Sequence, residues 1–220
     1  MSAPVVLVPG LGLGPESYSK TVEHLTTPYL VVTLPGYGEP AGAREDLHPR
    51  ALGVALADKI RERSVLVGHS GSCQIVVETA IVDPELVHAL VLVAPTGDAR
   101  MSSWVDRSVR WLGSAVPDAP RLIRVVTPQY ARTTIPSIAR AAEAARHHDL
   151  AAIITQVRVP GVIVRGKHDL ISPAEWVERL AELSHGEART LESGSHMPVL
   201  TNGPEVAALI QRAAAVPESD

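Results

Sequence analysis

A chain of 220 residues is the size of one domain and is long enough to bury a sizeable core. Its 20 Lys and Arg and 24 Asp and Glu residues give a net charge of −4 and are spread along the sequence, which excludes the basic blocks typical of proteins that bind nucleic acids or anionic membranes. One cysteine leaves no internal disulfide, and neither a secretory leader nor a membrane-spanning run is visible, so we expect a soluble, cytoplasmic protein.

Short, continuous apolar runs alternate with helical patterns along the chain. The runs predict strands at 5–8, 30–34, 65–67, 89–93, 162–164 and 188–191. Apolar residues at helical spacing and prolines at helix starts predict helices at 49–63, 72–83, 173–183 and 204–214. Strands without polar alternation belong to a sheet that is buried on both faces, which is typically parallel. The order of the elements therefore predicts an α/β fold with right-handed crossovers.

The glycine-rich segment GLGLG at 10–14 invites comparison with a dinucleotide-binding loop. That fingerprint requires a third glycine three residues after the second. The two registers place Pro15 and Ser17 at that position, and the predicted strand at 30–34 is not followed by an acidic residue that could hold a ribose. We therefore expect no dinucleotide and no other cofactor.

The segment VLVGHSGSCQIVVE at 65–78 passes from a strand to a helix with Ser70 at the apex. So tight a turn needs small neighbours, such as Gly71 and Ser72, and it exposes the serine oxygen above the edge of the sheet. The helix that follows directs backbone N–H groups and its positive dipole end to the same place. His69 cannot be the base for Ser70, because neighbours at a strand end project to opposite sides. We therefore expect Ser70 to be a nucleophile whose base comes from elsewhere.

Two further residues follow the last two predicted strands. Asp169 lies in VIVRGKHDLISP and His196 in LESGSHMP, so that both join Ser70 at the carboxyl ends of strands, where ligands bind in open α/β sheets. Serine is a weak nucleophile unless an imidazole takes its proton and a carboxylate fixes the imidazole tautomer. We predict a triad of Ser70, His196 and Asp169. Asp98 is the alternative acid, in which case Asp169 caps the helix near Pro173.

Three motifs connect the chain to a known family. VVLVPGLGLG lies at the first strand, LPGYG follows the second, and GHSGS forms the turn at Ser70. On these motifs the chain resembles, over nearly its whole length, the α/β-hydrolases of the capped esterase type. In that family they carry half of the oxyanion hole, a loop that often reads D-x-P-G-x-G, and the nucleophile elbow. Pro9 departs from the family pattern, where a His commonly precedes the glycine, and Ser72 replaces the last glycine of the elbow.

The resemblance implies an α/β-hydrolase fold. We expect a three-layer sandwich with a mostly or wholly parallel six-stranded sheet and a small helical cap. It also implies that the backbone N–H groups of Leu11 and Gly71 form the oxyanion hole.

The interval at 99–156 shows no strand pattern. In a compact domain, so long an excursion is usually a lid or a binding element, and we expect a helical cap inserted into a core formed by 1–98 and 157–220. The alternative is a helical insertion with a minor core of its own.

Aromatic and histidine residues in this interval are further candidates. Trp104, Trp111 and Tyr130 are expected to contact the substrate, because aromatic side chains provide a large contact area. The run His147-His148-Asp149 has no further ligand at a useful spacing, so we expect no metal.

These residues predict a serine-nucleophile hydrolase that acts on a small-molecule carboxylic ester, thioester or lactone through an acyl-enzyme. Two alternatives stay open: a non-hydrolytic member of the same fold, such as a lyase or a C–C bond-cleaving enzyme, and a non-catalytic binding protein. The expected partner is a small molecule, and both a monomer and a homodimer are compatible with the sequence.

Overall fold

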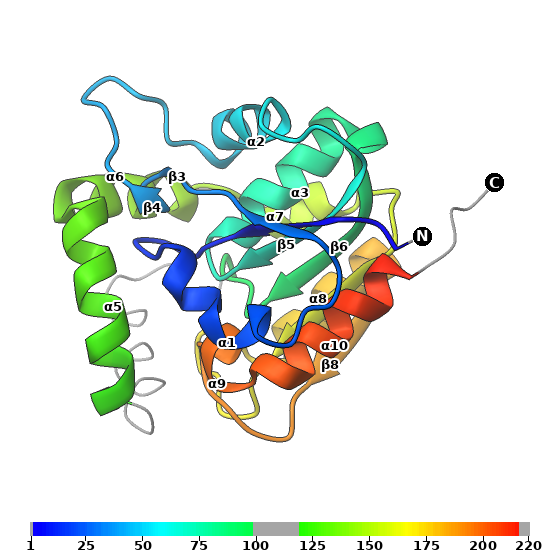
Figure 1. The fold of residues 1–220 in the computed structure, drawn as a ribbon. Helices are drawn as coiled ribbons and strands as arrows, with labels where there is room; N and C mark the ends of the chain where they lie inside the picture. The colour runs from blue at the N-terminus through cyan, green and yellow to red at the C-terminus, as the bar shows by residue number, and fades with distance from the viewer. Residues whose placement is uncertain (1, 99–118, 216–220) are drawn as a thin grey trace.

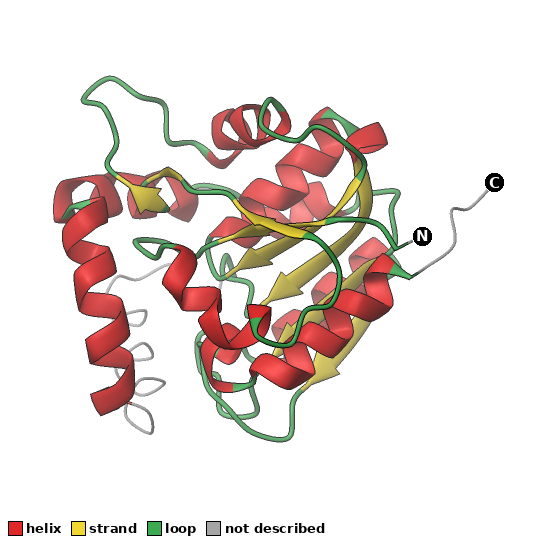
Figure 2. Cartoon of the chain, viewed as in Figure 1, coloured by secondary structure: helices red, strands yellow, loops and turns green. Residues whose placement is uncertain are grey.

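The structure is a computed structural model that describes residues 2–98 and 119–215. It contains a six-stranded sheet with helices on both faces, which makes three layers (Figures 1 and 2). The strand order is β2-β1-β5-β6-β7-β8, and every neighbouring pair is parallel, so the predicted fold is confirmed. The strands are β1 (Val5–Val8), β2 (Tyr29–Val31), β5 (Ser64–His69), β6 (Val87–Val93), β7 (Gly161–Arg165) and β8 (Glu187–Thr190).

The alternation of side chains along the strands gives the sheet two apolar faces. In β1, Val6 and Val8 belong to one apolar core cluster, whereas Val5 and Leu7 belong to a second cluster on the other face. Because both faces are covered, β5 and β6 are buried at every position, and most of their residues are apolar. The remaining elements are η1 (Pro15–Tyr18), α1 (Ser19–Val22), β3 (Leu34–Pro35), β4 (Gly38–Glu39), α2 (Pro49–Ala57), α3 (Ser72–Val82), η2 (Pro84–Leu86), α8 (Ala174–Ser184), α9 (Pro198–Thr201) and α10 (Gly203–Ala214).

The edge strand β2 contradicts the expectation that every strand is buried on both faces. It pairs with β1 alone, and its residues Tyr29 and Leu30 are 46% and 53% exposed. Its pairing with β1 ends at Val31, so the predicted strand at 30–34 is wrong at its C-terminal end. An edge strand has a neighbour on one side only, which leaves its apolar residues less covered.

Helix α2 ends at Ala57, six residues before the predicted end at 63. The N–H groups of Lys59 and Ile60 bond to the carbonyl groups three residues before them, which tightens and closes the helix. This turn places the Ile60 side chain in the core. The early end of the helix is therefore coupled to burial of an apolar side chain.

The described part of the interval at 99–156 is helical. It contains α5 (Ala119–Thr133), α6 (Ile135–Arg146) and α7 (Leu150–Ile154). Leu150 and Ile154 join the core cluster that contains α2 and α3, so α7 packs with the sheet domain. The division of the chain at 156 stays a prediction.

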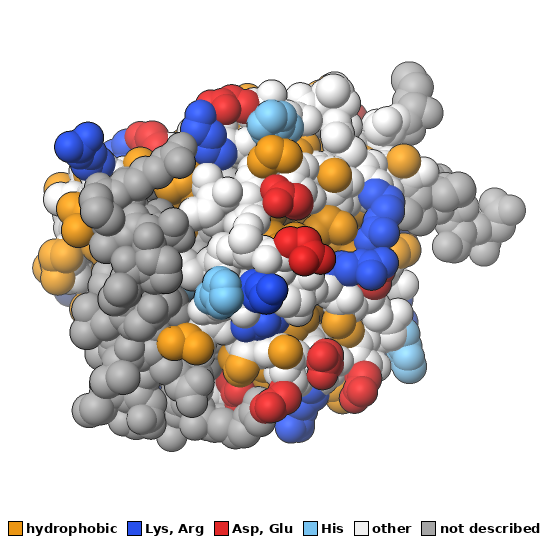
Figure 3. Space-filling view, turned by 90° about the horizontal axis from the view of Figure 1, so that it is seen from below, with side chains coloured by type: hydrophobic (Ala, Val, Ile, Leu, Met, Phe, Trp, Pro, Cys, Tyr) orange, Lys and Arg blue, Asp and Glu red, His pale blue; other side chains and the backbone are white. Residues whose placement is uncertain are grey.

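The surface carries charges of both signs. On the face seen from below, Lys and Arg side chains are interspersed with Asp and Glu side chains (Figure 3). None of the helices in the described part of the chain combines the length and the apolar character that a bilayer crossing requires.

Candidate active site

Ser70 lies on a sharp turn between β5 and α3. Its φ angle is +56°, in the left-handed region that residues other than glycine rarely adopt. Helix α3 begins two residues later, and a Cβ atom on Gly68 would lie only 2.8 Å from Cys73 Cα. A glycine therefore stands where the strand and the helix touch, and the serine lies at the apex of the turn.

The hydroxyl of Ser72 holds this turn in place. It accepts a hydrogen bond from His69 N–H at 2.8 Å and lies within bonding distance of the carbonyl oxygens of Val8, at 2.8 Å, and His69, at 2.9 Å. Below it, the thiol of Cys73 is fully buried and lies 3.3 Å from the Gly68 carbonyl oxygen. The elbow motif predicts a small residue at position 72. It does not predict the bond of Ser72 to Val8 O in β1, because that strand lies far away in the sequence.

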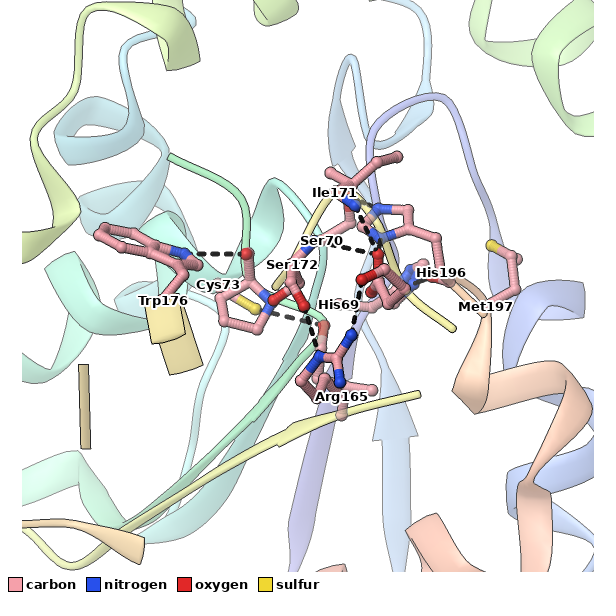
Figure 4. A network of polar contacts seen from close by, with 12 residues as sticks. His69, Ser70, Cys73, Arg165, Ile171, Ser172, Trp176, His196 and Met197 are labelled. Atoms are coloured by element: carbon pink, nitrogen blue, oxygen red, sulfur yellow. Dashed lines mark hydrogen bonds and ion pairs between the residues drawn. The ribbon is translucent and has the colours of Figure 1, made fainter. Parts of the chain in front are cut away.

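The structure brings Ser70, His196 and Asp169 together (Figure 4). Ser70 Oγ lies 2.9 Å from His196 Nε2, and His196 Nδ1 lies 3.0 Å from Asp169 Oδ2 and 3.1 Å from Oδ1. When Nδ1 keeps its proton and donates a hydrogen bond to the carboxylate, Nε2 is free to accept a proton from the serine. Both contacts of Nδ1 are with Asp169, so the geometry favours Asp169 over Asp98 as the partner of this histidine.

The loop after β7 fixes the Asp169 side chain. Oδ1 accepts hydrogen bonds from the N–H groups of Ile171 and Ser172, both at 2.9 Å. The buried Arg165 guanidinium donates to the carbonyl oxygens of Asp169, at 2.6 Å, and Ser172, at 2.7 Å (Figure 4). The carboxylate is therefore oriented by its own loop as well as by His196.

This environment keeps Asp169 ionised. Burial acts to raise the pKa of its carboxyl group, but the charge and hydrogen bond of His196 and the two loop N–H groups outweigh burial and hold the pKa below its ordinary value. An ionised Asp169 can accept a hydrogen bond from Nδ1–H and stabilise a positive charge on the imidazole ring.

His69 has a role that the sequence did not reveal. Its side chain is buried, and its Nε2 donates to the backbone carbonyl oxygen of His196 at 2.9 Å. Burial, together with the nearby His196, lowers the pKa of His69 to about 4, so the ring is neutral near pH 7. His69 thus supports the backbone of His196, and among the described residues no hydrogen bond joins its ring to Ser70. No motif signals a bond between residues so far apart in the chain.

The two predicted oxyanion donors have unbonded N–H groups. Within the described residues, neither Leu11 N–H nor Gly71 N–H has an acceptor, although the next two residues of the first loop do. There, Gly12 N–H bonds to Gly36 O at 2.8 Å and Leu13 N–H bonds to Gly10 O at 2.9 Å. An oxyanion hole requires N–H groups without a protein acceptor, and these two N–H groups meet that requirement in the described part of the chain.

Tyr130 of α5 lies over the loop that contains Leu11. A Cβ atom on Gly12, whose φ angle is +75°, would be 2.8 Å from Tyr130 Cε1. Tyr130 also packs on an apolar cluster that includes Leu13 and Met197, the residue after His196. Of the three aromatic residues predicted to contact the substrate, Tyr130 is thus placed beside the site. The other two, Trp104 and Trp111, lie outside the described residues.

The His147-His148-Asp149 run separates into three different contacts. His147 bonds to Glu143 at 2.9 Å, and His148 bonds to the buried Glu78 at 2.8 Å. Asp149 accepts from Ala152 N–H at 3.1 Å and caps α7. These side chains serve helix packing and capping.

A parallel α/β sheet with serine, histidine and aspartate at the carboxyl ends of three strands defines the architecture of an α/β-hydrolase. Residues 5–209 match the sequence profile of the alpha/beta hydrolase family, and the chain belongs to that family. It is an enzyme of the hydrolase type.

Individual relatives cover almost the whole chain. The sequence is 25% identical to a pimeloyl-[acyl-carrier protein] methyl ester esterase of Methylococcus capsulatus, over 94% of this chain and 92% of that protein. A hydrolase from Oleispira antarctica matches with a TM-score of 0.80 at 13% identity, over 98% of this chain and 92% of the other. The enol-lactonase from Burkholderia xenovorans LB400 matches with a TM-score of 0.74 at 18% identity, over 97% and 91%. These two structures share the fold of this chain.

Proposed function

We propose that the protein is a serine hydrolase that cleaves a small-molecule carboxylic ester, thioester or lactone through an acyl-enzyme on Ser70. The observation that supports this most directly is the continuous series of hydrogen bonds from Ser70 through His196 to Asp169. The left-handed backbone of Ser70 adds to it, since strain of this kind clusters at functional sites.

In the proposed reaction, Ser70 Oγ attacks the carbonyl carbon while its proton passes to His196 Nε2. The carbonyl oxygen becomes an oxyanion, which the N–H groups of Leu11 and Gly71 stabilise. The intermediate expels the alcohol or thiol, which takes the proton from His196, and the acyl group stays on Ser70. A water molecule then gives a proton to His196 as its oxygen attacks the acyl carbon. The bond between Ser70 Oγ and the acyl carbon breaks, His196 returns the proton to Ser70 Oγ, and the acid is released. In both halves, Asp169 stabilises the imidazolium.

Two observations support an ester with a hydrocarbon portion as the substrate. The elements beside His196 are apolar, because Tyr130, Leu13 and Met197 pack together there. The relative from Methylococcus capsulatus is named as a methyl ester esterase. We therefore place carboxylic esters first, and thioesters and lactones second.

We also propose that the substrate is a free small molecule in the cytoplasm, with no nucleic acid or membrane as partner. The mixed charges of the surface and the single, buried thiol of Cys73 support this proposal.

A panel of p-nitrophenyl acyl esters, acyl thioesters and lactones, with wild type and Ser70→Ala, tests the function. We expect Ser70→Ala to lose turnover and to retain its fold, with only the acceleration due to binding and the oxyanion hole remaining. A fluorophosphonate should label wild type once, on the peptide that contains Ser70.

Ser184→Ala is the matched control, because Ser184 lies at the end of α8 and its hydroxyl bonds to Leu180 O within its own helix. It should be labelled and turn over like wild type. A Ser70→Ala protein with the wild-type rate would exclude Ser70 as the nucleophile.

A further inference from the structure

The C-terminal half of α5 is hydrogen-bonded to the loop that carries Leu11. Thr133 Oγ1 donates to Gly12 O at 3.0 Å, and Gln129 Oε1 accepts from Gly14 N–H at 2.6 Å. Both side chains are almost fully buried, with exposed fractions of 0% and 1%. Figure 1 shows α5 standing beside this N-terminal segment, which is drawn in blue. A helix from the middle of the chain therefore supplies polar partners to a loop from its beginning.

The side chains of Thr133 and Gln129 have fixed orientations. Thr133 and Gln129 lie four residues apart and so project from one face of α5. The amide of Gln129 is oriented at its other end, because Nε2 donates to Val125 O at 2.6 Å and leaves Oε1 to Gly14. Buried polar side chains that are bonded at both ends have a single favourable arrangement.

The loop is also held from the opposite side. Gly12 N–H donates to Gly36 O at 2.8 Å, while Gly12 O accepts from Thr133. The peptide planes before and after Gly12 are therefore both fixed, immediately after the N–H group of Leu11. The side chains of Tyr130 and Ile138 leave no room for a Cβ atom on Gly12, so both pack directly against the loop.

We propose that Thr133 and Gln129 are positioning residues that fix the Leu11 N–H group for the oxyanion. This inference rests on the proposed function. Neither side chain needs to touch the substrate, because each acts through the backbone of the loop. An oxyanion donor interacts mainly with the transition state, so a loosened loop lowers kcat and leaves KM nearly unchanged.

Thr133→Val tests the role of the hydroxyl, because valine keeps the shape and removes the donor. We expect kcat on a p-nitrophenyl ester to fall about 10- to 100-fold, the range produced by a small misplacement of a catalytic group. Thr133→Ser, which keeps the hydroxyl and loses a methyl group, should retain most of the wild-type kcat. A role in packing alone would give the opposite order, with valine tolerated and serine impaired.

Thr79→Val is the matched control. Thr79 is equally buried, and its hydroxyl lies 3.1 Å from a glycine carbonyl oxygen, Gly53 O, and 3.0 Å from Ile75 O. These contacts lie within α3 and between α3 and α2, away from the loop of Leu11. This variant should lose stability and keep kcat. Fluorophosphonate titration gives the concentration of folded sites, so that kcat is counted per active enzyme. Gln129→Met removes the acceptor of the Gly14 N–H group and should lower kcat in the same way. It provides the test if Thr133→Val does not fold.

The inference is overturned if Thr133→Val and Gln129→Met both keep kcat within about twofold of wild type, or if Thr133→Ser loses as much as Thr133→Val. In either case, inactive Ser70→Ala would leave the proposed function standing. Active Ser70→Ala would instead remove the proposed function itself.

Discussion

Replacing Asp169 with Asn is expected to reverse the tautomer of His196 without unfolding the loop. Asp169 Oδ1 is bonded to the Ile171 and Ser172 N–H groups, and an Asn side chain keeps that oxygen in place. The NH₂ group of Asn then takes the position of Oδ2, which lies 3.0 Å from His196 Nδ1. Oδ1 lies 3.1 Å from Nδ1 but already accepts the two loop N–H groups, so the NH₂ contact decides the tautomer. Because NH₂ only donates, Nδ1 becomes the acceptor and the ring proton moves to Nε2. Nε2 can then no longer take the proton of Ser70.

The expected loss is on the order of 10⁴ in kcat. At 1.36 kcal/mol for each factor of ten, this corresponds to about 5 kcal/mol of transition-state stabilisation. The free energy of unfolding should change much less, because the two backbone bonds of the loop survive. A large loss of activity with a small loss of stability is therefore the signature of this substitution.

The assay compares kcat on one p-nitrophenyl ester for wild type, Asp169→Asn and Asp98→Asn, with urea unfolding of each protein. Asp98→Asn should have nearly the wild-type rate, because His196 Nδ1 is bonded to Asp169. The reasoning is refuted if Asp98→Asn is the more damaged of the two. The acid would then come from the segment after β6, and Asp169 would only organise its own loop.

Two further substitutions test the surroundings of Ser70. Because the folded pKa of His69 is lowered to about 4 from 6.5, the unfolded chain binds this proton first, and stability is lost as the pH falls from about 6.5 towards 4. Urea unfolding should show wild type losing about 2 kcal/mol more than His69→Gln between pH 7 and pH 5, and equal losses would contradict a neutral buried ring. Gly68→Ala should destabilise the protein by about 1–3 kcal/mol or more and lower kcat, because its Cβ meets backbone atoms of Cys73 and Ser72 at 2.8–2.9 Å. Gly161→Ala is the control, because a Cβ atom on Gly161 would lie 4.0 Å from Leu90 O, the nearest atom outside the adjacent residues. Similar stability and activity of the two variants would show that the turn at Gly68 can accommodate a methyl group.

The fold was predictable because its signals are local and repeated. Continuous apolar runs such as that at 89–93 indicate a strand with both faces covered, and the compact turn around Ser70 identifies one carboxyl end of the sheet. The order of strands then places the loops of Asp169 and His196 at the same edge. The placement of Asp169 and His196 could therefore be predicted from the single assumption that the sheet is parallel.

What could not be predicted depends on contacts between distant segments. The exposure of Leu30 follows from the position of β2 at the edge of the sheet, and its composition is that of a central strand. The bonds of His69 to His196 O, of Thr133 to Gly12 O and of Gln129 to Gly14 N–H join single polar side chains to backbone atoms far along the chain. Such pairs have no periodicity, so only the packed structure reveals them.

The reactivity of the Cys73 thiol can report local opening of the structure between α3 and β5. It lies fully buried beneath the turn, against the carbonyl oxygens of Gly68 and Val93, and burial raises its pKa well above the ordinary value. A thiol reagent such as Ellman's reagent can therefore reach it only when α3 separates from β5. The rate of its modification in native buffer measures how often the strand and the helix part, and saturation with a substrate analogue would show how far an occupied site suppresses that event.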